Sequence, residues 1–353
     1  MEILYAALIL GAMGLVFGIV LTFASKIFAV PANPTRDAIR EVLPSANCGA
    51  CGYPGCDGCA DAIACGKAPV NACPVGGAEV GAKVAAIMGV EAASGADRKV
   101  ARVICQGDCE AAKVKFVYTG IQDCMAAATV ADGFKACQFA CLGLGTCVKA
   151  CQFDAIHIDP EKQIAVVDES KCTSCGKCVE ACPKGVIELQ YASAPVALLC
   201  HNTGMGKKVM DVCKNGCIGC QKCAKSCKFG AITMENNLPV IDREKCRGCQ
   251  VCAEVCPTHA IKALQPRRVA EIDDSTCIGC TICARNCQFG AIEGTLKQPH
   301  EVNAACTGCG ACAEKCPKKC ITLKDATAPR DPKAAVEAPA KPAAPAKAPV
   351  DKE

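Results

Sequence analysis

Cysteine spacing constrains this chain more than any other feature. Two copies of one pattern, C-x2-C-x2-C-x3-C, run from Cys277 to Cys287 and from Cys306 to Cys316. Three closely spaced thiolates can bind three irons of one [4Fe–4S] cube, and the fourth cysteine reaches the cube of the neighbouring copy. Two adjacent copies therefore predict a pair of clusters that are held by crossed ligands.

Other uses of cysteine fit the sequence less well. The chain has 36 cysteines among 353 residues, a content that indicates a disulfide scaffold in a short secreted protein. Four-cysteine groups recur here at fixed spacing without a cleavable signal before them, which argues against disulfides. A third cysteine three residues beyond a CxxC pair does not serve a tetrahedral zinc ion. Soft thiolates at this density fit iron–sulfur chemistry in a reducing compartment.

Cysteine combs of this kind begin at six positions, residues 137, 172, 217, 246, 277 and 306. The odd-numbered combs continue as CQFDAI, CKFGAI and CQFGAI, whereas a proline follows the last cysteine of each even-numbered comb. This alternation predicts three tandem two-cluster ferredoxin-like units of class α+β, with short strands such as 164–167 and 238–241 between the combs.

The crossover rule assigns a ligand set to each comb. In the first comb Leu144 stands where the third comb has Cys220, so Cys137 is the nearest substitute. That cube is expected to use Cys137, Cys141, Cys147 and Cys182. The intact combs predict Cys172, Cys175, Cys178 with Cys151; Cys217, Cys220, Cys223 with Cys256; Cys246, Cys249, Cys252 with Cys227; Cys277, Cys280, Cys283 with Cys316; and Cys306, Cys309, Cys312 with Cys287.

A smaller cysteine group precedes the combs. It consists of NCGACGYPGC and a cysteine 17 residues further on. Its glycines allow a tight fold that turns backbone N–H groups toward sulfide. We expect one [4Fe–4S] cluster here, which brings the predicted total to seven, and we interpret Cys59 and Cys65 as small buried thiols. The ligands would be Cys48, Cys51, Cys56 and Cys73.

Some cysteines have no place in these sets. Cys105 and Cys200 each end a similar apolar strand, VARVIC and PVALLC. Spacing alone leaves open an eighth cluster from Cys105, Cys109, Cys124 and a fourth thiolate. Cys320 replaces an alanine of the repeat and is expected to pack.

The N-terminal residues 3–24 form one uncharged apolar run. As a helix this run would extend about 33 Å, enough to cross a bilayer. A cleaved signal peptide is the alternative, but the positive charges, from Lys26 onward, follow the run. The positive-inside rule predicts a single-pass protein of the cytoplasmic (inner) membrane with its later domains in the cytoplasm. Gly14 and Gly18 could face a partner helix or lipid.

Composition sets the remaining expectations. The near-balanced net charge of +4 does not favour nucleic acid as a partner. No glycine-rich nucleotide loop and no nucleophile or acid–base constellation is present, so we expect no catalytic residues. The expected domains are a transmembrane helix at 1–26, the four-cysteine domain with its linker at 27–97, ferredoxin pairs at 98–195, 196–269 and 270–324, and a disordered Ala/Pro/Lys tail at 325–353.

The order of these features resembles the B subunits of the Rnf complex. The resemblance rests on the apolar N-terminus, NCGACGYPGC, CIGCTICARNC and CTGCGACAEKCPKKCITL, and covers residues 1–96 and 270–323. It implies an iron–sulfur subunit that accepts electrons from reduced ferredoxin, with membrane and flavin subunits as partners, in a complex that reduces NAD and moves sodium ions or protons. Residues 99–269 add two ferredoxin pairs, similar to extended subunits of anaerobes.

Two other functions stay open. A similar complex could keep a redox-sensing regulator reduced, and a polyferredoxin could serve a hydrogenase or a heterodisulfide reductase. The combination of NCGACGYPGC with a membrane anchor argues against the polyferredoxin. In each case we expect no complete activity from this chain alone, because it has no sequence for a flavin or nicotinamide site.

Overall fold

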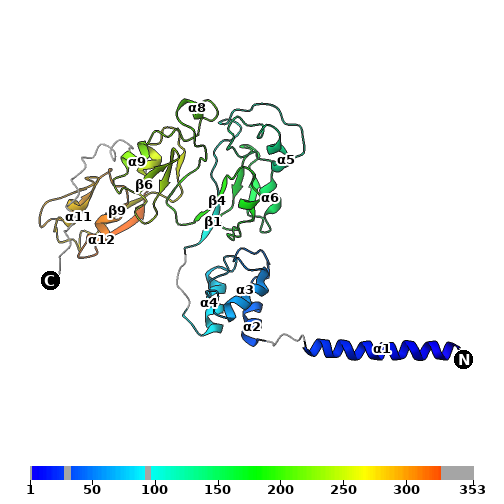
Figure 1. Ribbon diagram of the computed structural model, residues 1–353. Helices are drawn as coiled ribbons and strands as arrows, with labels where there is room; N and C mark the ends of the chain where they lie inside the picture. The colour runs from blue at the N-terminus through cyan, green and yellow to red at the C-terminus, as the bar shows by residue number, and fades with distance from the viewer. Residues whose placement is uncertain (1, 28–32, 92–96, 327–353) are drawn as a thin grey trace, which may run out of the picture. The chain divides into compact units, whose positions relative to one another are not determined.

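The structure is a computed structural model that describes residues 2–27, 33–91 and 97–326 (Figure 1). The chain divides into two compact units, Met1–Gly95 and Ala96–Glu353. Most of the tail that we expected to be disordered, residues 327–353, lies outside the described residues.

The first unit is helical. Its helices are α1 (Glu2–Ile27), α2 (Pro34–Val42), α3 (Gly55–Ala64) and α4 (Gly77–Met88). Helix α2 begins where the Asn33 side chain accepts two backbone N–H groups and a proline occupies the first helical position, two features that favour a helix start. Ile39, Ile63 and Val84, one from each of α2, α3 and α4, are fully buried and form the centre of the small core.

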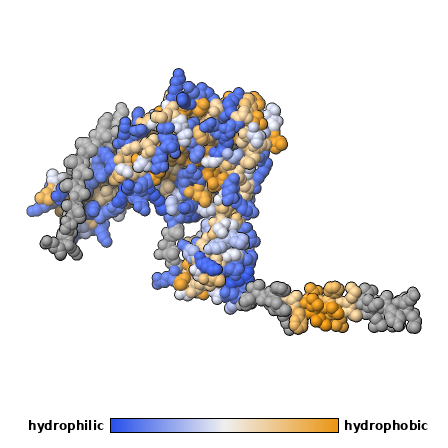
Figure 2. Space-filling model, viewed as in Figure 1, coloured by the Kyte–Doolittle hydropathy of each residue, from blue (hydrophilic) through white to orange (hydrophobic). Residues whose placement is uncertain are grey.

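Helix α1 exposes large apolar side chains along its described part. Leu15, Phe17, Leu21 and Phe23 are each more than half exposed, and Figure 2 shows this stretch as a continuous apolar surface. Across the described ranges, however, no helix is both long enough and apolar enough to cross a bilayer. The expected transmembrane span at residues 3–24 is therefore not confirmed.

The second unit repeats one topology, strand–helix–strand–strand–helix–strand, three times. The first and last strands of each copy pair antiparallel, and so do the two middle strands. The ferredoxin-like repeats expected from the combs are thus present. The copies comprise β1 (Lys99–Val103), α6 (Thr146–Ala150), β2 (Ile156–Ile158), β3 (Ala165–Val167), α7 (Lys177–Glu180) and β4 (Ile187–Tyr191); β5 (Val196–Leu198), α9 (Lys222–Ser226), β6 (Ile232–Glu235), β7 (Leu238–Ile241), α10 (Val251–Glu254) and β8 (Ile261–Ala263); β9 (Arg268–Ile272), α11 (Ile282–Asn286), β10 (Ile292–Glu293), β11 (Glu301–Val302), α12 (Ala311–Lys315) and β12 (Ile321–Asp325).

The outer strands bring the two ends of each copy together. In the first copy Lys99 of β1 pairs with Tyr191 of β4. In the third copy Arg268 of β9 pairs with Asp325 of β12, and the two strands lie side by side in Figure 1. The chain therefore enters and leaves each of these copies at neighbouring points.

The first two copies carry an insert between their first strand and their first comb helix. The first insert, residues 104–136, contains α5 (Cys124–Thr129), and the second insert, residues 199–216, contains α8 (Lys207–Met210). The backbone N–H of Lys113 donates to the carbonyl of Val212 at 3.0 Å. The two inserts therefore lie against each other, although they belong to different copies.

A left-handed residue precedes each comb helix. The six positions have φ between 60° and 80°. Glycine adopts this conformation without steric cost, whereas other residues pay on the order of 1 kcal/mol. The turn is common to all copies because it directs the first three cysteines of a comb toward the same pocket. The residues are Gly145, Gly176, Gln221, Gln250, Thr281 and Gly310.

Candidate iron–sulfur sites

Four pockets of the second unit each contain a crossed set of four cysteines, three from one comb and one from the other comb of the same copy; Cys320 is a fifth cysteine in one of them. Their empty volumes are similar, about 310 to 330 Å³. The crossover rule predicts this arrangement. The sets are Cys172, Cys175, Cys178 and Cys151; Cys217, Cys220, Cys223 and Cys256; Cys277, Cys280, Cys283 and Cys316; and Cys306, Cys309, Cys312 and Cys287.

The third cysteine of each comb lies in the first turn of the comb helix and is buried. Burial, followed by repulsion from the neighbouring thiols, raises the pKa of Cys178 to about 11 and the pKa of Cys312 to about 12. These groups are therefore neutral thiols at pH 7 unless a cation replaces the proton. Iron binding supplies such a cation and releases protons.

Backbone N–H groups point at the cysteine sulfurs. The N–H of Ala155 donates to Cys151 Sγ at 3.4 Å, and the N–H of Ala291 donates to Cys287 Sγ at 3.2 Å. Each donor is the alanine of a CQF-x-A motif, four residues after the cysteine. The motif is visible in the sequence, but its spacing alone does not predict this role. Such N–H groups stabilise the negative charge of a bound cluster.

The outer strands supply a second type of donor. Ala101 of β1 donates its N–H to Cys172 Sγ at 3.3 Å, and Ala270 of β9 donates to Cys306 Sγ at 3.4 Å. In both copies the acceptor is the first cysteine of the second comb. The strand that closes the copy therefore also stabilises its predicted cluster.

The remaining set of the second copy is also brought together. Burial, and then the nearby thiols of Cys249, Cys246, Cys223 and Cys227, raise the pKa of Cys252. Cys223 belongs to the neighbouring set, and the other four residues are the ones that the crossover rule assigns to the fourth comb.

The first comb departs from expectation. Burial, followed by the thiols of Cys141, Cys124 and Cys182, raises the pKa of Cys147 to about 12. Helix α5 carries Cys124 to this place, and the backbone N–H of Cys124 donates to Thr146 Oγ1 beside Cys147 at 2.7 Å. Cys124 is therefore among the thiols around Cys147, whereas Cys137, the expected member of the set, lines a different pocket. This difference has a tertiary cause, because the first insert folds back onto the comb helix.

The three cysteines considered for an eighth cluster have different surroundings. Cys124 is among the thiols around Cys147. Cys109 is exposed, and its thiol donates to the carbonyl oxygen of Glu161 at 3.0 Å. Cys105 lines a different pocket together with Cys137.

The first unit places its cysteines around the start of α3. Burial, followed by the thiols of Cys51, Cys73 and Cys56, raises the pKa of Cys59 to about 12. Cys48, the fourth predicted ligand, is half-buried in the preceding loop.

The leftover cysteines of the two units have different surroundings. Cys59 is buried as expected, but Cys65 is exposed, so its interpretation as a buried thiol is wrong. Cys320 is buried as expected, with 3.5 Å between its Sγ and that of Cys316. It also lines the pocket of the set that contains Cys277.

The pockets fit the [4Fe–4S] group by the chemistry of their walls. Each of the four offers four soft sulfur ligands and apolar side chains around open space. Within the described part of the chain, no group of three or more His, Cys, Asp or Glu side chains is arranged around a single metal ion. A cube suits a more open arrangement, because its own irons and sulfides separate the four thiolates.

Comparison with family models agrees with this description. Residues 43–75 match an Fe-S cluster model, and residues 165–188 match a 4Fe-4S binding domain. Residues 216–260, 245–291 and 270–323 match 4Fe-4S dicluster domains. Fold and cysteine pockets together define a ferredoxin-type protein with multiple [4Fe–4S] domains.

Curated relatives narrow this class. The B subunit of the Na(+)-translocating ferredoxin:NAD(+) oxidoreductase complex of Acetobacterium woodii is 52% identical over 67% of this chain and 71% of its own length. The B subunit of the ion-translocating oxidoreductase complex of Methanosarcina acetivorans is 42% identical over 72% and 96%. The chain belongs to this family of B subunits, which confirms the resemblance to Rnf subunits.

Two further comparisons complete the picture. The B subunit of the proton-translocating ferredoxin:NAD(+) oxidoreductase complex of Clostridium ljungdahlii is 40% identical over 71% of this chain and 89% of its own length. A chain of the formate dehydrogenase–heterodisulfide reductase–formylmethanofuran dehydrogenase complex of Methanospirillum hungatei overlaps 58% of this chain and 89% of its own, with 20% identity and a TM-score of 0.24. That score is too low to support any argument.

Proposed function

We propose that this chain is the iron–sulfur subunit of an ion-translocating ferredoxin:NAD oxidoreductase. It accepts electrons from reduced ferredoxin and passes them to partner subunits of the complex. The observation that carries this proposal is the series of crossed four-cysteine pockets within one compact unit. Membership of the B-subunit family supports the identity of the donor and the partners.

The residues of each pocket have defined tasks. When bound, a [4Fe–4S] cluster supplies one-electron redox chemistry. The cysteines would hold it as thiolate ligands, and the backbone N–H groups of residues such as Ala101 and Ala155 would stabilise the thiolate charge. Apolar side chains such as Ile156 and Ile292 exclude water from the pocket walls.

The ligand sets belong to the same proposal. Four sets are those of the crossed pockets, and a fifth joins Cys227 to the fourth comb. The sixth is the set of the first comb, Cys124, Cys141, Cys147 and Cys182. The seventh is Cys48, Cys51, Cys56 and Cys73 of the first unit.

Helix α1 is proposed to anchor the protein in the cytoplasmic membrane in a single pass, with the chain that follows α1 on the cytoplasmic side. Support comes from the uncharged run at residues 3–24 and from the exposed apolar side chains of Leu15, Phe17 and Leu21. Positive residues after the run, among them Arg36 and Arg40, fit a cytoplasmic location.

The test is electron uptake by the full-length, cluster-loaded chain in detergent. Reduced ferredoxin should bleach its visible absorbance rapidly in a stopped-flow instrument, and added NAD should stay oxidised because the chain carries no proposed flavin or nicotinamide site. Chain stripped of iron by a chelator is the control and should show no bleaching. Failure to accept electrons from ferredoxin, or NADH formation by the chain alone, would contradict the proposal.

A second experiment addresses the other functions that the sequence left open. Affinity purification of the tagged chain from solubilised membranes should recover flavin and membrane subunits together with it. Recovery of a hydrogenase or of a heterodisulfide reductase instead would favour a polyferredoxin.

A further inference from the structure

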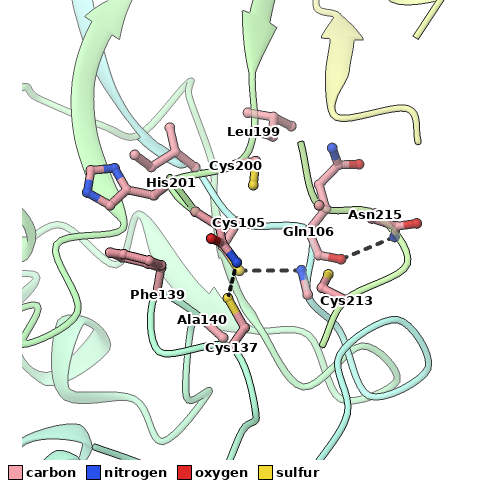
Figure 3. Close-up of a pocket in the computed structure, with 14 residues that line it drawn as sticks. Cys105, Gln106, Cys137, Phe139, Ala140, Leu199, Cys200, His201, Cys213 and Asn215 are labelled. Carbon is pink, nitrogen blue, oxygen red and sulfur yellow. Dashed lines mark hydrogen bonds between the residues drawn. The ribbon is translucent and has the colours of Figure 1, made fainter. Parts of the chain in front are cut away.

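A fifth cysteine pocket lies between the first and second inserts. It is lined by Cys105, Cys137, Cys200 and Cys213. Figure 3 shows their sulfur atoms turned toward one shared space. The empty volume of about 340 Å³ is close to that of the crossed pockets. None of these residues is needed by the proposed ligand sets. They come from three stretches of the chain, namely the first insert, the start of the first comb and the second insert.

The sulfur atoms of this pocket accept hydrogen bonds like those of the crossed pockets. Cys105 Sγ accepts the backbone N–H of Gly107 at 3.3 Å and that of Cys141 at 3.4 Å. Cys200 Sγ accepts the backbone N–H of Cys217 at 3.2 Å. The side-chain amide of Asn202 donates to Cys137 Sγ at 3.4 Å. Such donors stabilise the negative charge of sulfur ligands in a bound cluster.

A buried lysine adds positive charge. Lys135 is 3% exposed, and its Nζ donates to the carbonyl oxygen of Gly107 at 2.7 Å, next to Cys105 in the pocket wall. A buried anionic group requires such compensation.

The surrounding backbone holds the pocket in shape. Ala112 and Cys213 form an antiparallel bridge between the two inserts. The side chain of Asn215 donates to the carbonyl oxygen of Gln106 at 3.2 Å, a bond drawn in Figure 3. The side chain of Gln106 in turn donates to the carbonyl oxygen of His259 at 2.9 Å, in the second copy. The pocket is thus built jointly by the first and second copies.

We propose that Cys105, Cys137, Cys200 and Cys213 bind an eighth [4Fe–4S] cluster that bridges the first and second ferredoxin copies. Its position follows from the residues that donate hydrogen bonds to Cys105 and Cys200. One donor, Cys141, is a proposed ligand in the first copy, and the other, Cys217, is a proposed ligand in the second copy. The eighth site would therefore have a neighbouring cluster on either side. The inference rests on the proposed function only in requiring that the chain binds [4Fe–4S] clusters.

Metal content of the full-length chain tests this proposal. After anaerobic reconstitution we expect about 32 irons and an equal amount of acid-labile sulfide, at four irons a cube. The double variant Cys200→Ala/Cys213→Ala should contain about 28. The matched control is Cys65→Ala/Cys109→Ala, which removes two exposed cysteines and should keep about 32.

Several results would overturn the proposal. They are a wild-type content of no more than about 28 irons, equal iron in wild type and double variant, or zinc in place of the missing iron. If the double variant loses most of its iron through misfolding, the single variant Cys200→Ser decides, since it should lose iron from one cube only. Failure of the proposed function has a different signature, namely normal iron content without reduction by ferredoxin.

Discussion

The backbone N–H of Cys217 donates a hydrogen bond to the Sγ atom of Cys200, with 3.2 Å between nitrogen and sulfur. The donor belongs to a predicted ligand of the second copy, and the acceptor belongs to the pocket between the inserts. On the opposite side of that pocket, the N–H of Cys141 makes the equivalent bond to Cys105. The pocket between the inserts is thus hydrogen-bonded to the backbone of a predicted ligand in the first copy, Cys141, and of another in the second copy, Cys217.

The separation of Cys124 from Cys137 predicts a pattern of iron loss. If both Cys137 and Cys213 belong to one cube, Cys137→Ala/Cys213→Ala should lose about four irons. Cys124→Ala/Cys213→Ala removes a ligand from each of two cubes and should lose about eight. Iron and sulfide analysis with circular dichroism as a folding control measures both. Equal losses in the two variants would contradict the separation.

Lys135 is predicted to raise the reduction potential of the cluster in the pocket between the inserts. Lys135→Met removes a buried positive charge beside Cys105, so the reduced, more negative cluster loses stabilisation. We expect the reduction potential of this cluster to fall by on the order of 50 mV, which is equivalent to about 1 kcal/mol for one electron. A redox titration followed by electron paramagnetic resonance measures it. Lys113→Met, which removes an exposed charge from the same insert, should leave the potential unchanged.

His300 offers a test of a second kind at the set that contains Cys277. It is 1% exposed and lines that pocket, and neither of its ring nitrogens has a hydrogen-bond partner in the described part of the chain. We expect a ring N–H to donate to sulfur when the cluster is present, since a buried unpartnered donor is costly. His300→Leu should then lower the potential on the order of 50 mV.

The control for that measurement is His157→Leu, at an exposed position in the first copy. An unchanged potential in His300→Leu, with normal iron content, would show that the histidine serves packing alone.

Arg102 is predicted to hold the first copy closed. Its guanidinium donates to both carboxylate oxygens of Glu169, at 2.9 and 3.1 Å, and to the carbonyl oxygen of Tyr191 at 3.0 Å. Arg102→Met should lower the free energy of unfolding by about 2 kcal/mol. Most of this loss should come from the buried hydrogen-bond partners left unpaired, since the ion pair with Glu169 is partly exposed to solvent. We expect faster loss of visible absorbance in urea. Lys99→Met on the same strand should have little effect, and a comparable loss there would contradict the assignment.

Removal of residues 1–26 should release the protein from membranes without loss of iron, because no cysteine precedes Cys48. Fractionation after a salt wash, combined with iron analysis, measures both. A truncated chain that still sediments with membranes would show that another part of the chain holds it there.

Cysteine spacing predicts much of this structure because the cysteines of one comb lie close together in the sequence. The crossed sets, the β7 strand at 238–241 and the repeated unit all follow from residues close in sequence. The proximity of Cys124 to Cys147 does not, because Cys124 arrives there through the fold of the first insert. The similar strand ends VARVIC and PVALLC were the available signal for the pocket between the inserts. They end in Cys105 and Cys200, but only the tertiary structure shows that both residues line one pocket.

The pairing of Lys99 with Tyr191, and of Arg268 with Asp325, has a consequence for how such chains can change length. Because a copy begins and ends at adjacent points, a whole copy can be duplicated, deleted or circularly permuted without rerouting the remaining chain. Gene duplication could therefore extend the molecule one two-cluster module at a time. The inserts, which contact each other between the first and second copies, would then provide the interface between adjacent modules.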